Sequence, residues 1–304
     1  MDITASMVKE LRESTGAGMM DCKKALSECE GDMTAAVDVL RTRGLADLAK
    51  KAGRATNAGL ISAFVEPTGK IAALVEVNCE TDFVARNAEF ATFVSALAEQ
   101  VAVDDPDGIA TGDAPLLAQL YKRNPALTVE QSLGEMVSKL DENMGVSRFE
   151  RYELVGPAAI GSYIHGVGRI GVLVELVGAE ASDEQVAAVA RDIAMHIAAA
   201  APGWVSSADV PADVIEHEKA IYMAQGAESG KPEAIQAKIA EGRIAKFFKE
   251  VTLLEQPFVK DPDISVGEHI ARTGKAVGAE LSVARFTRWV LGETAETAAE
   301  DSGC

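Results

Sequence analysis

Residues 59–78 read GLISAFVEPTGKIAALVEVN, and this stretch indicates the fold. Two runs of strand-forming apolar residues flank the turn residues Pro67-Thr68-Gly69-Lys70, which predicts a β-hairpin. Residues 161–178, GSYIHGVGRIGVLVELVG, repeat the pattern, and residues 70–76 align with residues 169–175 at a constant shift of 99 positions. A helical pattern follows each hairpin, so we expect two related α+β halves made by duplication.

The helix after the first hairpin is expected in residues 88–102, where one apolar stripe recurs at helical spacing: Phe90, Phe93, Val94 and Leu97. The corresponding helix of the second half is expected in residues 181–200. Residues 147–156 and 281–293 have the composition of further strands.

Helices are expected outside the two halves as well. Residues 2–48 predict three short helices, the first capped by Thr4, the third beginning at Asp32 and ending at Gly44. Residues 206–249 predict an antiparallel helical hairpin, with a turn at Ser229-Gly230-Lys231 and Pro232 at the start of its second helix.

The predicted organisation is therefore α+β with antiparallel strands. It has a three-helix module with a linker (1–54), a first core subdomain (55–155), and a second core subdomain (156–290) that includes the helical hairpin (206–249) and a C-terminal module (262–290), followed by a flexible tail (291–304).

Composition limits the possible functions. The 304 residues are 48% hydrophobic and 25% charged, which is typical of a globular chain with two or three domains. No apolar run approaches the ~18 residues that span a bilayer, and the start MDITASMVKELRES lacks the features of a secretory signal. The formal net charge of −18 argues against direct nucleic-acid binding. Four cysteines without CxxC spacing (Cys22, Cys29, Cys79 and Cys304) indicate free thiols in a reducing cytoplasm.

Residues 41–54 are unusually basic for this chain, with Arg41, Arg43, Lys50, Lys51 and Arg54 against Asp47. A solvated linker helix is the simpler interpretation. The alternative is an RNA contact, as in an RNA- or ribosome-binding accessory protein.

Two segments resemble nucleotide-binding loops. GVGRIG, residues 166–171, matches a dinucleotide fingerprint, but a strand rather than a helix follows it, so its glycines are better explained by a hairpin turn. GKPEA, residues 230–234, lacks the Ser or Thr and the upstream glycine of a P-loop. The sequence therefore predicts no bound cofactor.

Catalytic and metal sites receive little support. The four histidines (His165, His196, His217 and His269) lie in separate segments without metal-ligand spacing, and His196 has the surroundings of a core or interface residue. A small hydrolase using Cys79 or Asp82 is an alternative function, although no local motif supports it.

The segment Thr81-Asp82-Phe83-Val84 stands where the first hairpin ends. The second half has Gly178–Ser182 at this place, so the scaffold repeats and TDFV does not. A structural plug would be needed in both halves, which favours a functional role. If Phe83 engages a partner, its side chain is expected to face solvent in the free protein. For Met19 and Met20, both core filling and an adaptable contact surface remain open.

A set of motifs occurs in order along the chain. Because of these motifs, the chain resembles the bacterial elongation factor Ts family from end to end. The motifs are TGAGMMDCKKAL (15–26), VNCETDFVARN (77–87), GSYIHG…RIGVLVE, AMHIAA, SGKPE, EGR and QPFV. The resemblance implies a nucleotide exchange factor for elongation factor Tu, and not an enzyme. It also implies a ubiquitin-associated-like three-helix module, two related core subdomains, a protruding helical hairpin and a C-terminal module.

The resemblance further implies which residues act. Thr81, Asp82, Phe83 and Val84 would dislocate Mg²⁺ from the partner, and Met19, Met20 and His165 would bind it. The partner would be elongation factor Tu in its GDP-bound and nucleotide-free states, with no metal or cofactor of this chain's own. The acidic surroundings of the helical hairpin and the tail ending in Cys304 depart from the family pattern.

Overall fold

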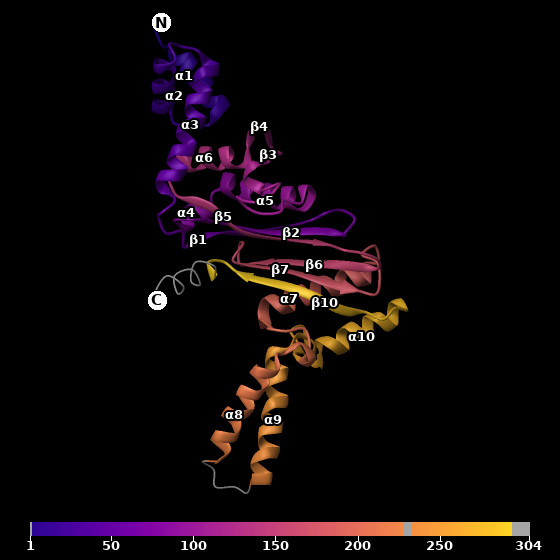
Figure 1. Cartoon of the computed structure of the whole chain (residues 1–304). Helices are drawn as coiled ribbons and strands as arrows, with labels where there is room; N and C mark the ends of the chain where they lie inside the picture. The colour runs from indigo at the N-terminus through magenta and orange to yellow at the C-terminus, as the bar shows by residue number, and fades with distance from the viewer. Residues whose placement is uncertain (1, 228–232, 294–304) are drawn as a thin grey trace.

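The computed structural model describes residues 2–227 and 233–293. The molecule is elongated, with helices α1–α3 at one end, two three-stranded β-sheets in the middle and the helix pair α8 and α9 projecting from the other end (Figure 1). The turn residues Ser229-Gly230-Lys231 and Pro232 lie outside the described residues. The expected tail is also outside them from residue 294 onward, including Cys304.

The three N-terminal helices are α1 (Ala5–Thr15), α2 (Met19–Glu28) and α3 (Met33–Lys51). The caps are those that the sequence predicts: the Thr4 hydroxyl accepts from the N–H of Met7, and the Asp32 carboxylate accepts from the first turn of α3. Leu11, Leu26 and Ala36 belong to the small core that these helices enclose.

The prediction that α3 ends at Gly44 is wrong, because the helix continues to Lys51. Gly44 lies where α3 crosses α6 (Val129–Leu140). A Cβ atom at Gly44 would lie 3.1 Å from the carbonyl carbon of Gly134 in α6. The glycine therefore allows two helix backbones to approach closely, a role that a helix-ending glycine does not have.

Each half of the core contains one antiparallel three-stranded sheet. The first has the order β1-β2-β5 and the second the order β10-β7-β6. The two expected hairpins, β1 with β2 and β6 with β7, are confirmed. The strands are β1 (Ala58–Val65), β2 (Ile71–Cys79), β5 (Met144–Glu153), β6 (Ala158–His165), β7 (Ile170–Val177) and β10 (Ser282–Val290).

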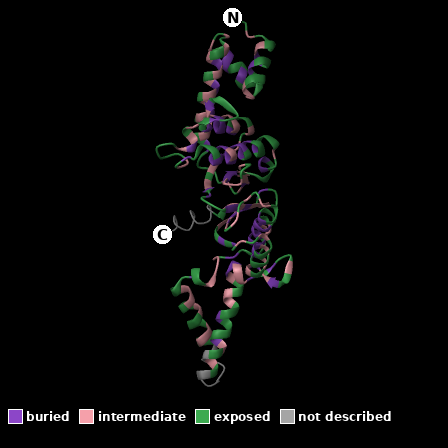
Figure 2. Ribbon diagram, turned by 90° about the vertical axis from the view of Figure 1, so that its right-hand side faces the viewer, coloured by how far each residue is buried: buried purple, intermediate pink, exposed green. Residues whose placement is uncertain are grey.

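The two sheets face each other, and one long helix covers the outer face of each (Figure 1). Helix α5 (Ala88–Asp104) packs on the first sheet and α7 (Glu184–Ala200) on the second. Ile61, Leu74 and Leu173 are among the buried residues between the sheets. Figure 2 shows that buried residues concentrate in these layers and between the N-terminal helices.

The repeat extends further than the sequence analysis predicted. In both halves a 3₁₀ turn, a short hairpin and a helix that begins with a capping box come after the long helix, directly in the first half and after η2, α8 and α9 in the second. The capping boxes pair Thr128 with Gln131 and Ser265 with Glu268. The elements are η1 (Leu116–Ala118), β3 (Leu120–Tyr121), β4 (Asn124–Thr128) and α6, then η3 (Leu253–Glu255), β8 (Pro257–Phe258), β9 (Asp261–Ser265) and α10 (Val266–Val277).

Arginines exchange contacts across the two sheets in a reciprocal way. Arg148 of β5 pairs with Glu76 of its own sheet at 2.8 Å, and its guanidinium lies 4.5 Å from the ring centroid of Trp289 in the other sheet. The second half repeats this arrangement in the opposite direction with Arg285, Glu175 and Tyr152. The interface thus has approximate two-fold symmetry, as expected for duplicated halves.

The projecting pair consists of α8 (Ala212–Ala227) and α9 (Glu233–Val251), which pack against each other as the predicted helical hairpin (Figure 1). Its described residues are mostly exposed or intermediate (Figure 2). The remaining helical turns are α4 (Asp82–Ala85) and η2 (Ser207–Asp209).

Candidate partner-binding site

The TDFV segment forms a short helical turn, α4, directly after β2. Thr81 caps this turn and is held by Glu142: its hydroxyl donates to one carboxylate oxygen at 2.6 Å and its N–H donates to the other at 3.0 Å. Sequence reasoning missed Glu142, which lies 61 positions away. Its two hydrogen bonds fix the entry to α4 on a neighbouring part of the core.

Glu80, the residue before Thr81, is also held in place. Its carboxylate accepts a hydrogen bond from the N–H of Asn143 at 2.6 Å and pairs with Arg54 at 3.2 Å. The Asn143 N–H, together with Arg54, lowers the pKa of Glu80, so the carboxylate is charged at neutral pH. The backbone that enters α4 is therefore held at two consecutive residues, Glu80 and Thr81.

Neighbouring side chains of α4 point in opposite directions. Phe83 is 83% exposed, whereas Val84 is 4% exposed and belongs to the core of the first half. Phe83 is thus no core plug, and the expectation that it faces solvent is confirmed. Val84 anchors the turn from inside, so its own side chain does not face a partner.

Asp82 presents a carboxylate beside Phe83. It pairs with Arg86 one turn later at 2.9 Å, and both side chains are largely exposed. An exposed pair of this kind contributes at most ~1 kcal/mol to stability. Asp82 can therefore exchange this partner for another at little cost.

The turn between β6 and β7 lies next to α4. A cavity of about 620 Å³ has Asp82 and Arg86 on one side and Gly166 and Val167 of this turn on the other. His165, at the end of β6, is exposed, and its Nδ1 lies 3.3 Å from the hydroxyl oxygen of Tyr163. The structure thus brings the TDFV segment and the turn next to His165 to the same end of the sheets.

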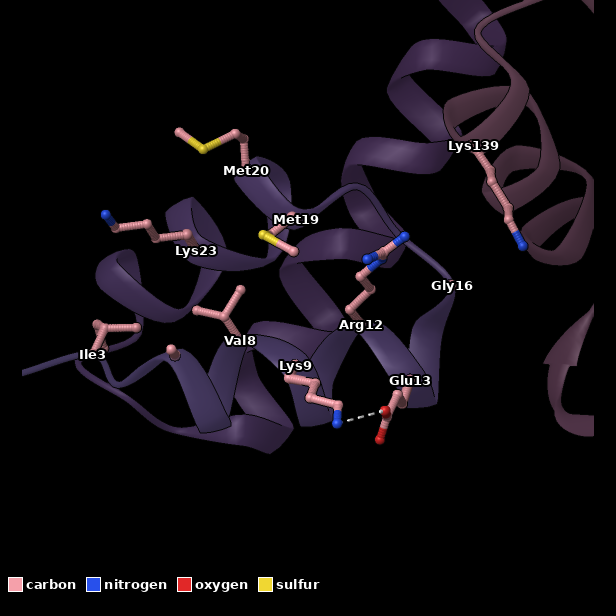
Figure 3. A pocket seen from close by; sticks show the side chains of 11 residues that line it. Ile3, Val8, Lys9, Arg12, Glu13, Gly16, Met19, Met20, Lys23 and Lys139 are labelled. Atoms are coloured by element: carbon pink, nitrogen blue, oxygen red, sulfur yellow. Dashed lines mark ion pairs between the residues drawn. The ribbon is translucent and has the colours of Figure 1, made fainter.

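Met19 and Met20 lie in a different place, on the N-terminal helices. Their side chains are 56% and 63% exposed, so the core-filling interpretation is wrong. They border a hollow of about 990 Å³ whose floor includes Val8 and whose rim carries four cationic side chains: Lys9, Arg12, Lys23 and Lys139. Figure 3 shows both thioethers projecting from the start of α2 on the side of this hollow.

The structure argues against a hydrolase that uses Cys79 as its nucleophile. Cys79 is fully buried and its thiol donates to the carbonyl oxygen of Thr81 at 3.2 Å. Burial, and then the charge of Glu142, raises the pKa of this thiol to about 12. The thiolate that would attack a substrate is therefore scarce at neutral pH.

In the basic segment 41–54, Lys50 and Arg54 are exposed as in a solvated linker, but Lys51 is not. Lys51 is buried, and its ammonium pairs with Asp141 at 2.7 Å and donates to the carbonyl oxygen of Val137. Arg43 pairs with Glu28 at 2.6 Å and Arg54 with Glu80. Because these cations neutralise acids of the same chain, they offer little free charge to RNA.

The remaining sequence hypotheses concern ligands. His196 is buried: its Nδ1 accepts from the N–H of Val259 at 3.2 Å, and its Nε2 lies 2.8 Å from Gln256, which confirms a core histidine. Gly166 and Gly168 adopt positive φ in the β6–β7 turn, as a hairpin requires. Within residues 2–227 and 233–293, no cluster of three His, Cys, Asp or Glu side chains could hold a metal ion. In the same part of the chain, no helix is long and apolar enough to cross a membrane.

Comparisons with known proteins agree with the motifs. The family model described as elongation factor TS matches residues 80–293. Elongation factor Ts of Clostridium kluyveri is 46% identical over 299 residues, covering 98% of this chain and 96% of the relative. Elongation factor Ts of Nitratidesulfovibrio vulgaris is 47% identical over 305 residues, covering 99% and 100%. The chain therefore belongs to the elongation factor Ts family, whose members are nucleotide exchange factors of translation elongation and not enzymes.

Proposed function

We propose that this protein promotes GDP release from elongation factor Tu by placing α4 near the Mg²⁺ and nucleotide site of that GTPase. The observation that carries the proposal is Phe83, an aromatic side chain that is 83% exposed on a turn whose entry is held by hydrogen bonds and whose Val84 is buried in the core. An exposed aromatic on a fixed support enters a partner with little loss of conformational entropy.

The chemistry needs no acid, base or nucleophile from this chain. Mg²⁺ bridges the phosphates of a bound nucleotide and the GTPase, so displacing the ion weakens GDP binding. Thr81 and Val84 hold the turn, Phe83 supplies the apolar wedge, and Asp82 supplies a carboxylate that can leave Arg86. The exchange factor then binds the nucleotide-free state more tightly than the GDP-bound state.

Thermodynamic linkage sets what this preference must achieve. If the exchange factor lowers the affinity of Tu for GDP by a given ratio, GDP lowers the affinity of Tu for the exchange factor by the same ratio. Burying one Phe side chain contributes roughly 1.5–3 kcal/mol, and each tenfold change in affinity needs ~1.4 kcal/mol. Phe83 can therefore supply one or two decades of coupling, and the other contact surfaces supply the rest.

Two further surfaces complete the proposal. The three-helix module of residues 1–54, with Met19 and Met20, contacts the GTPase domain, and the second core subdomain contacts another domain of Tu through His165. Adaptable thioethers suit such a contact. A protein that acts on Tu works in the cytoplasm, where we expect it.

The direct test is the release of fluorescently labelled GDP from Tu in the presence of Mg²⁺ and excess unlabelled GDP. The protein is expected to accelerate release at catalytic amounts, and excess Mg²⁺ is expected to oppose it. A release rate equal to that of Tu alone would refute the proposal.

A further inference from the structure

The turn between β6 and β7 contains an unusual residue. Val167 has φ = 55°, in the left-handed region that β-branched side chains rarely adopt. Its side chain is also 82% exposed. Burial of this side chain within the protein therefore does not offset the free-energy cost of its unfavourable backbone conformation.

The turn is fixed rather than free. The carbonyl oxygen of Gly168 accepts from the N–H of Ile61 in β1 at 2.8 Å, and the N–H of Arg169 donates to the carbonyl oxygen of His165 at 3.0 Å. Gly168 has φ = 81°, and a Cβ atom there would lie 2.8 Å from Cδ2 of Leu60 and 3.0 Å from the carbonyl oxygen of Ile61, so this position favours glycine. The position of Val167 is thus set by β1.

Strand β1 also supports α4, which packs against it. The turn and α4 consequently form two sides of the cavity of about 620 Å³, with Asp82 on one side and Val167 on the other. Two exposed apolar side chains, Phe83 and Val167, therefore stand on segments that both contact β1, at the same end of the sheets.

We propose that Val167 is a second apolar contact with elongation factor Tu and determines affinity together with Phe83. This inference rests on the proposed function. A strained conformation at an exposed residue points to a functional constraint, because folding alone would favour Gly or Asn at this position. The occupant of this surface is an apolar patch of Tu that lies between its contacts with Phe83 and His165.

Two substitutions test the inference, Val167→Asn and Val167→Gly. Both residues tolerate the left-handed conformation, and Asn keeps a side chain while making it polar. The melting temperature of the free protein is expected to stay the same or rise. The Kd for nucleotide-free Tu is expected to rise about three- to tenfold, mainly through faster dissociation. Val167→Ile keeps the apolar contact and should bind within about twofold of the wild type.

Val155→Asn is the matched control. Val155 is 92% exposed but lies at the opposite end of the sheets, where the neighbouring Leu154 N–H donates to the carbonyl oxygen of Lys70. It should leave the Kd unchanged.

Three outcomes would overturn the inference. The first is wild-type binding by Val167→Asn and Val167→Gly, while Phe83→Ala still slows exchange; this would leave the proposed function intact. The second is a lowered melting temperature that accompanies the loss of binding, which would mean a structural role. The third is a change in the self-association of the free protein, with unaltered affinity for Tu. If the wild type itself releases no GDP, both proposals fail.

Discussion

Truncation of Phe83 to alanine separates folding from partner binding. The side chain is 83% exposed, so its removal opens no cavity. An ordinary surface change alters the free energy of unfolding by less than ~0.5 kcal/mol. A core phenylalanine would instead cost roughly 3–5 kcal/mol. We therefore expect Phe83→Ala to melt like the wild type.

Exchange should respond in the opposite way. If Phe83 is buried in Tu only after GDP and Mg²⁺ are displaced, its truncation loses roughly 1.5–3 kcal/mol of selective binding. That loss corresponds to a reduction of about ten- to a hundredfold in the stimulated rate of GDP release. Affinity for the GDP-bound form should change less, because the wedge is not yet seated in that complex.

The assay combines thermal melting of the free protein with stopped-flow release of labelled GDP. Val84→Ala is the control from the same turn. Val84 is 4% exposed in the core, so its truncation should lower stability by about 2 kcal/mol and the melting temperature with it. The two adjacent substitutions should thus give contrasting profiles. Early melting of Phe83→Ala, or a stable Phe83→Ala protein that exchanges at the wild-type rate, would show that the reasoning is wrong.

Three more predictions follow from the contacts. Glu142→Gln should slow exchange several-fold with a small change in melting temperature, since it weakens the hold on Thr81 without touching the core; an unchanged rate would mean that the entry to α4 needs no such anchor. Gly44→Ala should destabilise the protein by about 1–3 kcal/mol in urea unfolding, because its Cβ meets the α6 backbone. Gly242→Ala in α9, where a Cβ meets nothing within 4 Å, is the control and should be neutral or stabilising. Equal effects of the two substitutions would contradict the close crossing of α3 and α6. Burial lowers the pKa of both His196 and His269. The unfolded chain therefore takes up protons first as pH falls below ~6.5, and the free energy of unfolding should decrease by up to ~1.4 kcal/mol per histidine per pH unit. Equal stability in urea at pH 7.5 and pH 5.5 would refute this.

Local patterns in the sequence predicted much of the fold. The apolar runs around Pro67–Lys70 and their copy at residues 161–178 gave both hairpins, because strand periodicity and turn residues are local properties. The caps at Thr4 and Asp32 were predicted for the same reason. The exposure of Phe83 followed from the comparison of the two halves, since a structural plug should recur in both.

Long-range contacts were not accessible in this way. Gly44 has the sequence context of a helix end, yet its role is set by the backbone of a helix about ninety positions later. Lys51 belongs to a run of basic residues that resembles a solvated surface, but Asp141 pairs with it and makes its burial possible. Glu142 holds Thr81 across a similar distance. A partner that is distant in sequence leaves no periodic signal at either residue.

The contacts within the duplicated core suggest how this protein acts in the proposed mechanism. Arg148 and Arg285 exchange ring contacts across the two sheets, so the halves are joined by reciprocal interactions. Among the described residues, the connection from β7 to α7 contains no counterpart of α4, so the TDFV turn belongs to the first half alone. A ligand changes an equilibrium only through its differential affinity for the two states. In the proposed mechanism, an exchange factor that adapted equally well to GDP-bound and nucleotide-free Tu would therefore not shift the equilibrium between them. In the proposed mechanism a fixed support makes Tu change instead, because Phe83 is expected to fit only after the Mg²⁺ site has opened.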